Sequence, residues 1–111
     1  MVIDYAAFEA VEMRVGTIVA IDEFPQARKP AYKLTIDFGE AIGTKRSSAQ
    51  IVELYSPETL IGAQVVGVVN FPPKRIAGFS SEVLVLGAAD EAGRVVLLRP
   101  ERSVPNGSRI Y

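Results

Sequence analysis

The stretch "KRSSAQIVELYSPETLIGAQVVGVVNF", residues 45–71, decides the fold. Residues 45–54 predict a strand whose first half is small, polar and positive, whereas residues 63–71 predict a buried strand that contains a glycine. Between them, "SPETLIG" predicts one helical turn, with Ser56 as N-cap, Pro57 at the first helical position and Gly62 at its end. The order is therefore strand, short helix, strand.

Alternating apolar residues predict further strands on both sides. "VEMRVGTIVAI" (11–21) alternates until Gly16, which predicts a bulge or sharp bend, and "AYKLTIDFG" (31–39) alternates throughout. "SEVLVLGAA" and "RVVLLRP" flank the hairpin loop "DEAG", and "VPNG" predicts a last tight turn. We expect one all-β domain over residues 1–111, a five-stranded OB-fold barrel with short helices and a C-terminal extension. An SH3-like barrel or a small sandwich is the alternative, but the helix after the third strand favours the OB fold.

Composition excludes several kinds of chemistry. The 111 residues include no cysteine and no histidine, so disulfides, thiolate nucleophiles, His-based triads and the usual metal ligands are absent. Scattered carboxylates such as Asp37, Glu53 and Glu82 show no pairing that would activate them. We therefore expect no enzyme activity, no cofactor and no metal. The sequence also shows neither a secretory leader nor a membrane-spanning run, which predicts a cytoplasmic protein without membrane insertion.

The charges are segregated along the chain. Residues 1–27 carry one cation and five acids, a net of −4; residues 28–75 carry seven cations and four acids, a net of +3; the remainder is balanced, four against four. Three clusters hold the central cations: "QARKPAYK" (26–33), "KRSSAQ" (45–50) and "NFPPKRIAGFSSEV" (70–83). Ordinary surface charge explains them equally well unless folding brings them together.

Several segments together resemble one family. "VEMRVGTIV", "ARKPAYKLTIDFG", "KRSSAQIV", "VVNFPPKRIAGFSSEVLVLG" and "VPNG" are similar to the tRNA-binding domain family, and most closely to its CsaA branch. The resemblance implies an OB fold, a homodimer and no catalysis. It implies as partners unfolded precursor proteins or peptides, with the export machinery, and it implies tRNA as a further or alternative ligand.

An OB barrel binds along its second and third strands and the adjoining loops. Only one of Lys45 and Arg46 can face this groove, and the resemblance favours Lys45. Small side chains there would let a ligand backbone approach closely, and Phe71 and Phe79 could stack on bases or hold apolar side chains. The expected peptide or tRNA groove comprises Arg28, Lys29, Lys33, Lys45, Ser47, Ser48, Gln50, Asn70, Phe71, Lys74, Arg75, Phe79 and Ser81.

One segment departs from the family pattern. Where tRNA-binding relatives tend to read Ser-x-Gly-Met, this chain has Ser81, Glu82 and Val83. Glu82 adds a negative charge near the expected path of phosphate, which favours a chaperone-like function over tRNA binding. For the dimer interface we expect the N-terminal helix and the C-terminal stretch, represented by Tyr5, Phe8, Val104, Ile110 and Tyr111.

Overall fold

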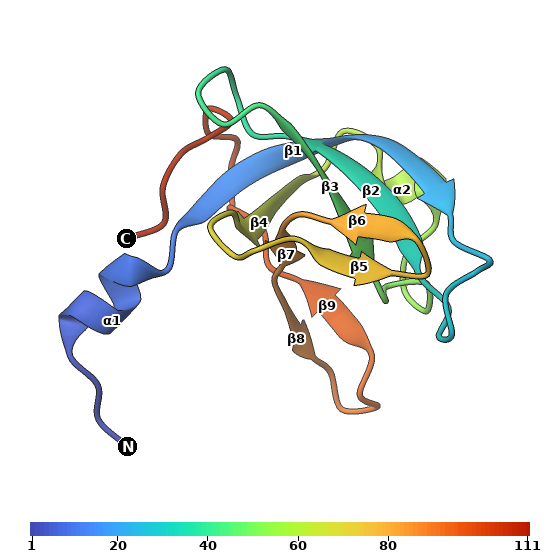
Figure 1. Cartoon of the computed structure of the whole chain (residues 1–111), viewed down its shortest axis with the longest axis horizontal. Coiled ribbons are helices and arrows are strands. Elements are labelled where there is room, and N and C mark those ends of the chain that lie inside the picture. The colour runs from blue at the N-terminus through green and yellow to red at the C-terminus, as the bar shows by residue number, and fades with distance from the viewer.

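The computed structural model describes residues 1–111 and contains one antiparallel sheet of five strands. The sheet curls into a nearly closed barrel with the strand order β3-β2-β1-β4-β7, so that β3 and β7 are its two edges (Figure 1). The OB-fold prediction is confirmed. The strands are β1 (Met13–Glu23), β2 (Tyr32–Asp37), β3 (Thr44–Ala49), β4 (Gln64–Val68) and β7 (Leu84–Val85).

The long strand β1 belongs to both halves of the barrel. Its first part pairs with β4 and its second part with β2, and the register shifts between Ile18 and Ala20. The bulge is therefore not at Gly16, as the sequence led us to expect, because Gly16 pairs in regular register with Val65. Gly16 serves close packing instead: a Cβ atom there would lie 2.6 Å from Cγ2 of Ile36 and 2.8 Å from the ring of Phe38.

The core lies inside the barrel. Ile18, Leu34, Ile36, Phe38 and Val65 are fully buried, and they come from β1, from β2 and its end, and from β4. The alternation predicted for residues 31–39 is confirmed, because Leu34, Ile36 and Phe38 all face this core.

The two helices play different roles. Helix α2 (Pro57–Leu60) forms as predicted, with Ser56 and Thr59 capping its start, and it buries Leu60 against the core. Helix α1 (Tyr5–Ala10) also forms, but none of its residues is buried and it leads away from the barrel (Figure 1). The sequence predicts a short helix from Tyr5 to Glu9 that lies over one end of the domain, but in the structure this helix buries no residue. A six-residue helix makes less than two turns, so it has no broad face to bury against the barrel.

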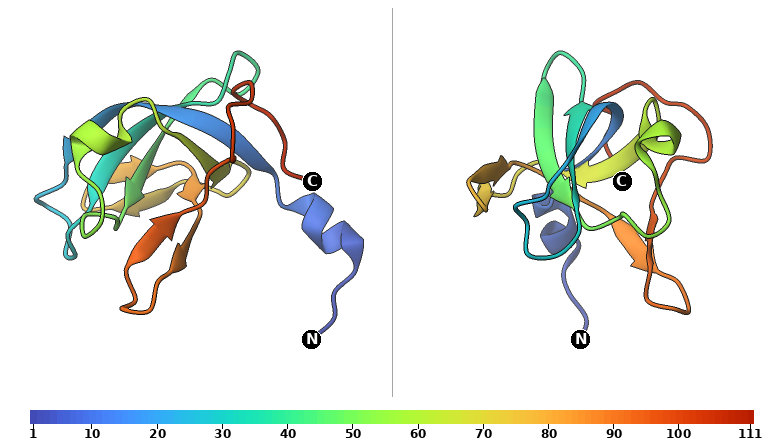
Figure 2. Two further views of the ribbon diagram at one scale, coloured as in Figure 1. Left: turned by 180° about the vertical axis from the view of Figure 1, so that it is seen from behind. Right: turned by 90° about the vertical axis from the view of Figure 1, so that its right-hand side faces the viewer.

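Two small hairpins extend the barrel. Strands β8 (Gly87–Ala89) and β9 (Val95–Leu97) form the predicted hairpin around residues 90–93, and it projects from the barrel (Figure 2). Strands β5 (Lys74–Ile76) and β6 (Phe79–Ser81) form a hairpin that we did not predict. Its two-residue turn has positive φ at both Ala77 (47°) and Gly78 (83°), as a type I′ turn requires.

The C-terminal stretch runs back along β1. Ile110 donates its main-chain N–H to Met13, and the guanidinium of Arg109 donates to the carbonyl of Glu9 at 2.8 Å. These bonds place the C-terminal stretch beside the end of helix α1 (Figure 1 and the left view of Figure 2). No helix of the structure is long and apolar enough to cross a membrane.

Candidate peptide and nucleic-acid groove

The register between β2 and β3 decides which side chains of β3 face outward. Ser47 lies opposite Leu34, so it faces the barrel interior. Its side chain is 1% exposed and its hydroxyl donates to the carbonyl of Val83 at 2.8 Å. Ser47 therefore holds the barrel closed and cannot contact a ligand, unlike the groove position that the sequence indicated. Lys45 shares this face opposite Ile36 and is half-buried.

The outer face of β2 and β3 carries two cations above an aromatic pair. The rings of Phe24 and Phe79 meet edge to face, with centroids 5.4 Å apart. The ammonium of Lys33 lies 4.8 Å from the Phe24 centroid, and the guanidinium of Arg46 lies 4.7 Å from the Phe79 centroid. Arg46, rather than Lys45, thus shares this surface with Lys33, and Asp22 lies 3.7 Å from its guanidinium.

These contacts restrict what the phenylalanines can do. Phe79 is 8% exposed, and Lys33 and Arg46 both lie over its ring. Base stacking needs a free aromatic face, so Phe79 is unsuited to it. Phe71, which is 49% exposed, is the predicted aromatic residue that a ligand can reach.

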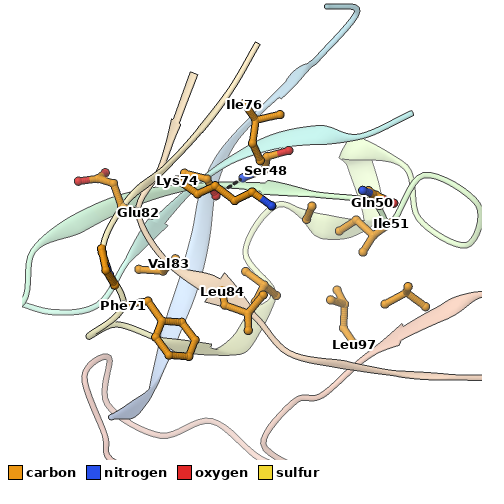
Figure 3. A pocket seen from close by; sticks show the side chains of 15 residues that line it. Ser48, Gln50, Ile51, Phe71, Lys74, Ile76, Glu82, Val83, Leu84 and Leu97 are labelled. Atoms are coloured by element: carbon orange, nitrogen blue, oxygen red, sulfur yellow. Dashed lines mark hydrogen bonds between the residues drawn. The ribbon is translucent and has the colours of Figure 1, made fainter. Parts of the chain in front are cut away.

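The largest hollow of the groove is a pocket of about 580 Å³ between β3, β7 and the two hairpins. Five predicted residues line it: Ser48, Gln50, Phe71, Lys74 and Ser81. Figure 3 shows Lys74 and Ser48 on one side of the pocket, and Leu84 and Leu97 on the other. Nine of its 15 lining residues are hydrophobic, so the pocket suits apolar side chains more than phosphates.

The sequence does not predict the apolar wall of this pocket. Ile51, Val83, Leu84, Val85 and Leu97 line it, although Ile51, Val83 and Leu97 also contribute to the core. The alternation in "SEVLVL" and "RVVLL" signalled strands but not which face would remain open. The structure leaves Leu84 half exposed, which the alternating pattern does not indicate.

The other predicted groove residues lie outside the pocket. Arg28 lines a second hollow of about 410 Å³ beside Phe24, while Lys29 and Arg75 are exposed. The amide of Asn70 is occupied by the chain itself: Nδ2 donates to the carbonyl of Ala10 at 2.8 Å, and Oδ1 accepts from the N–H of Glu12 at 3.0 Å. Asn70 thus holds the junction between α1 and β1.

The predicted interface residues differ in exposure. Tyr5 and Tyr111 are 66% and 99% exposed, and Phe8, Val104 and Ile110 are partly buried. Tyr5 packs against Phe8, with ring centroids 5.8 Å apart. No group of three acidic residues lies close enough together to hold a metal ion.

Residues 13–109 match the family described as "Putative tRNA binding domain". The chain belongs to this tRNA-binding domain family. A methionine–tRNA ligase from Methanothrix thermoacetophila is 38% identical over 109 residues, which are 98% of this chain but 16% of the ligase. The tRNA-binding domain described here thus spans about one sixth of that relative, and the ligase activity belongs to the whole enzyme.

Two solved structures within the CsaA branch are similar over the whole chain. The crystal structure of chaperone CsaA from Bacillus anthracis superposes with a TM-score of 0.94, is 54% identical and covers 100% of both chains. That of the CsaA chaperone protein from Picrophilus torridus gives a TM-score of 0.93 and 50% identity, covering 99% of this chain and 100% of the other. This tRNA-binding domain is therefore CsaA-like, as its sequence predicted.

Proposed function

We propose that this protein is an export-related chaperone that binds unfolded precursor segments in its groove. The pocket of about 580 Å³ carries the proposal, because most of its lining is hydrophobic and it is open to solvent. Unfolded chains expose apolar side chains that such a pocket can bury, at roughly 25 cal/mol per Å². The similarity to two proteins named CsaA chaperone supports the same function.

The second candidate function is tRNA binding, with a role in tRNA metabolism or aminoacylation. The family match and the methionine–tRNA ligase relative favour it. Exposed Arg28 and Lys29, together with Lys33 and Arg46 on the outer face of β2 and β3, supply cations for phosphate contacts. These side chains lie outside the apolar pocket, so the two ligands would use different parts of the surface.

A homodimer in the cytoplasm belongs to the same proposal. Helix α1 has no buried residue, and Tyr5 and Tyr111 expose most of their surface. A two-fold partner that covers α1 and the C-terminal stretch would bury these side chains. Sedimentation velocity tests this: a monomer at micromolar concentration would remove the dimer from the proposal.

One experiment separates the two functions. Total tRNA and a urea-denatured precursor are each titrated into the protein, in parallel, at 50 and 200 mM salt. About four phosphate contacts would weaken tRNA binding roughly 100-fold over this range, and eight contacts in a dimer about 10⁴-fold. Binding of the precursor should change little, because the pocket buries apolar groups. Tight, salt-sensitive tRNA binding without any suppression of precursor aggregation would overturn the chaperone proposal.

Two substitutions sharpen the comparison. Lys29→Glu reverses an exposed cation and should weaken tRNA binding, whereas Leu84→Ser removes an exposed apolar side chain from the pocket wall and should weaken precursor binding. Each variant serves as the control for the other. Lys45→Glu is a third variant: it should weaken ligand binding only if this half-buried lysine reaches the groove.

A further inference from the structure

The outer edge of β3 has hydrogen-bond partners only along part of its length. The main chain of Arg46 bonds to Glu82: its N–H donates to the carboxylate at 3.0 Å and its carbonyl accepts from the Glu82 N–H at 2.8 Å. The next outward-facing N–H, that of Ser48, donates to the hydroxyl of Ser81 at 3.0 Å. Residues 81 and 82 thus hydrogen-bond to the outer edge of β3 much as a short neighbouring strand would.

Beyond Ser48, residues 81 and 82 make no further hydrogen bonds to the edge of β3. Gln50 is two residues further on, just past the last residue of β3, and neither its main-chain N–H nor its carbonyl has a partner within the protein. Gln50 and Ile51 both line the apolar pocket. A main-chain donor and acceptor therefore lie open at the rim of a hydrophobic hollow.

The opposite wall is also a strand edge. Leu86 donates its N–H to Val66 at 2.9 Å, so the alternation of an antiparallel ladder turns the main-chain groups of Val85 away from β4. Because β3 and β7 are the two edges of the sheet, the pocket occupies the place where the barrel is not closed by strand pairing.

We propose that the occupant of this gap is an extended polypeptide segment that adds to the outer edge of β3 as a strand. The main chain of the segment forms hydrogen bonds with the main-chain N–H and carbonyl of Gln50, and every second side chain of the segment enters the apolar pocket. This inference rests on the proposed chaperone function and specifies how that function recognises its ligand. Strand addition reads the main chain, which all unfolded proteins share, while the pocket selects apolar side chains.

The charged residues that line the pocket indicate which charge the bound segment should carry. Lys74 forms no ion pair within the protein, whereas one carboxylate oxygen of Glu82 already accepts from Arg46. Lys74 lies along the same side of the pocket as Ser48 and Gln50 (Figure 3). An acidic side chain or a chain-terminal carboxylate in the bound segment would complement this ammonium.

Two substitutions at Gln50 separate its main chain from its side chain. Gln50→Pro removes the N–H, which no group of the protein uses, and places a ring at the strand edge. Gln50→Ala keeps the N–H and removes the side-chain amide. The probe is a fluorescein-labelled nine-residue peptide with valine at every second position, threonine between and one glutamate. By anisotropy, we expect Gln50→Pro to bind about tenfold more weakly and Gln50→Ala to bind within about twofold of the unchanged protein.

The same probe with single N-methyl groups tests the peptide's side of the interaction. Methylation should weaken binding at alternate positions only, with a period of two, because only alternate amides face β3. This scan also decides the matter if circular dichroism shows that Gln50→Pro does not fold. An even effect at all positions, or a loss with Gln50→Ala as large as with Gln50→Pro, would overturn strand addition.

Failure of the proposed function gives a different result. If the unchanged protein binds neither this probe nor a denatured precursor, then the chaperone function itself is wrong. If it binds both, but Gln50→Pro and the methylated peptides bind as tightly as their parents, only strand addition is wrong. Lys74→Met adds a check on charge: it should weaken binding of the glutamate peptide and leave the glutamine version unchanged.

Discussion

Arg46 and Glu82 exchange two hydrogen bonds across the edge of β3, although they are 36 residues apart in the chain. One joins main chain to main chain at 2.8 Å, and in the other the Glu82 carboxylate accepts the Arg46 N–H at 3.0 Å. The carboxylate thus stands where a neighbouring strand would present a carbonyl. This pair fixes the segment after β6 against the barrel and sets one boundary of the apolar pocket.

The carboxylate of Glu82 should contribute measurably to stability. Glu82→Ala leaves the Arg46 N–H without its acceptor, and because this bond is partly solvent-exposed we expect a loss of about 1 kcal/mol in the free energy of unfolding. Glu82→Gln keeps an acceptor oxygen at the same place and should lose less. Urea denaturation of both variants measures the difference. Identical midpoints for the two variants would show that the acceptor does not matter.

Ser47 and Ser48 are adjacent but should respond very differently to the same change. Ser47→Ala removes the buried hydroxyl that bonds to Val83 and should cost about 1–2 kcal/mol of stability. Ser48→Ala should cost almost nothing, because the Ser48 hydroxyl makes no hydrogen bond within the protein and lies at the pocket. Thermal unfolding of the two variants provides the comparison. Equal losses would contradict the assignment of opposite faces.

This pair also shows why the sequence predicted the fold better than the site. Strands with apolar alternation, such as residues 31–39, state in their own pattern which face is buried. "KRSSAQ" is polar or small at every position, so its pattern does not tell its two faces apart. Only the pairing of Ser47 with Leu34 settles the question, and that register depends on the turn between the strands.

The β5–β6 hairpin escaped prediction for a related reason. Type I′ turns favour Asn-Gly or Asp-Gly, because both central residues need positive φ, whereas this turn is Ala77–Gly78. Ala77 is the only non-glycine residue with positive φ, so nothing in its identity signals the turn. The hairpin carries Lys74, Ile76 and Ser81 to the pocket, and the apolar site therefore became visible only in three dimensions.

The β8–β9 hairpin should loosen at low pH. The main-chain N–H of Arg94, above all, with the Arg94 guanidinium and the N–H of Ala92, lowers the pKa of the Asp90 carboxyl below its usual value near 3.8. Because the folded-state pKa is the lower one, the carboxylate's contribution is fully present above the usual pKa. It is lost as pH falls through the folded value.

NMR can follow this titration directly. The amide resonances of Ala92 and Arg94 should shift together with a midpoint below the usual aspartate range. In Asp90→Asn the same resonances should not titrate, which makes this variant the control. A midpoint at or above the usual aspartate value would show that these hydrogen bonds do not stabilise the ionised carboxyl.

Asn70 should control how firmly helix α1 is attached, and through it the proposed dimer. Its amide bonds to Ala10, the last residue of the helix, and to Glu12 just beyond it, and the helix itself buries no residue. Asn70→Ala removes both bonds, while Asn70→Asp keeps the acceptor for Glu12 and loses only the donor to Ala10. Hydrogen exchange of residues 5–12 should therefore accelerate most in Asn70→Ala and less in Asn70→Asp.

The barrel should be affected far less than the helix, because Asn70 is exposed and its partners lie outside the core. We expect the thermal unfolding of both variants to stay close to that of the unchanged protein. In sedimentation experiments their dimers should dissociate at a higher protein concentration than the dimer of the unchanged protein. If the dimer persists unchanged although residues 5–12 exchange faster, then α1 does not form the interface. The C-terminal stretch with Ile110 and Tyr111 would then have to supply it, since it is the other part of the expected interface.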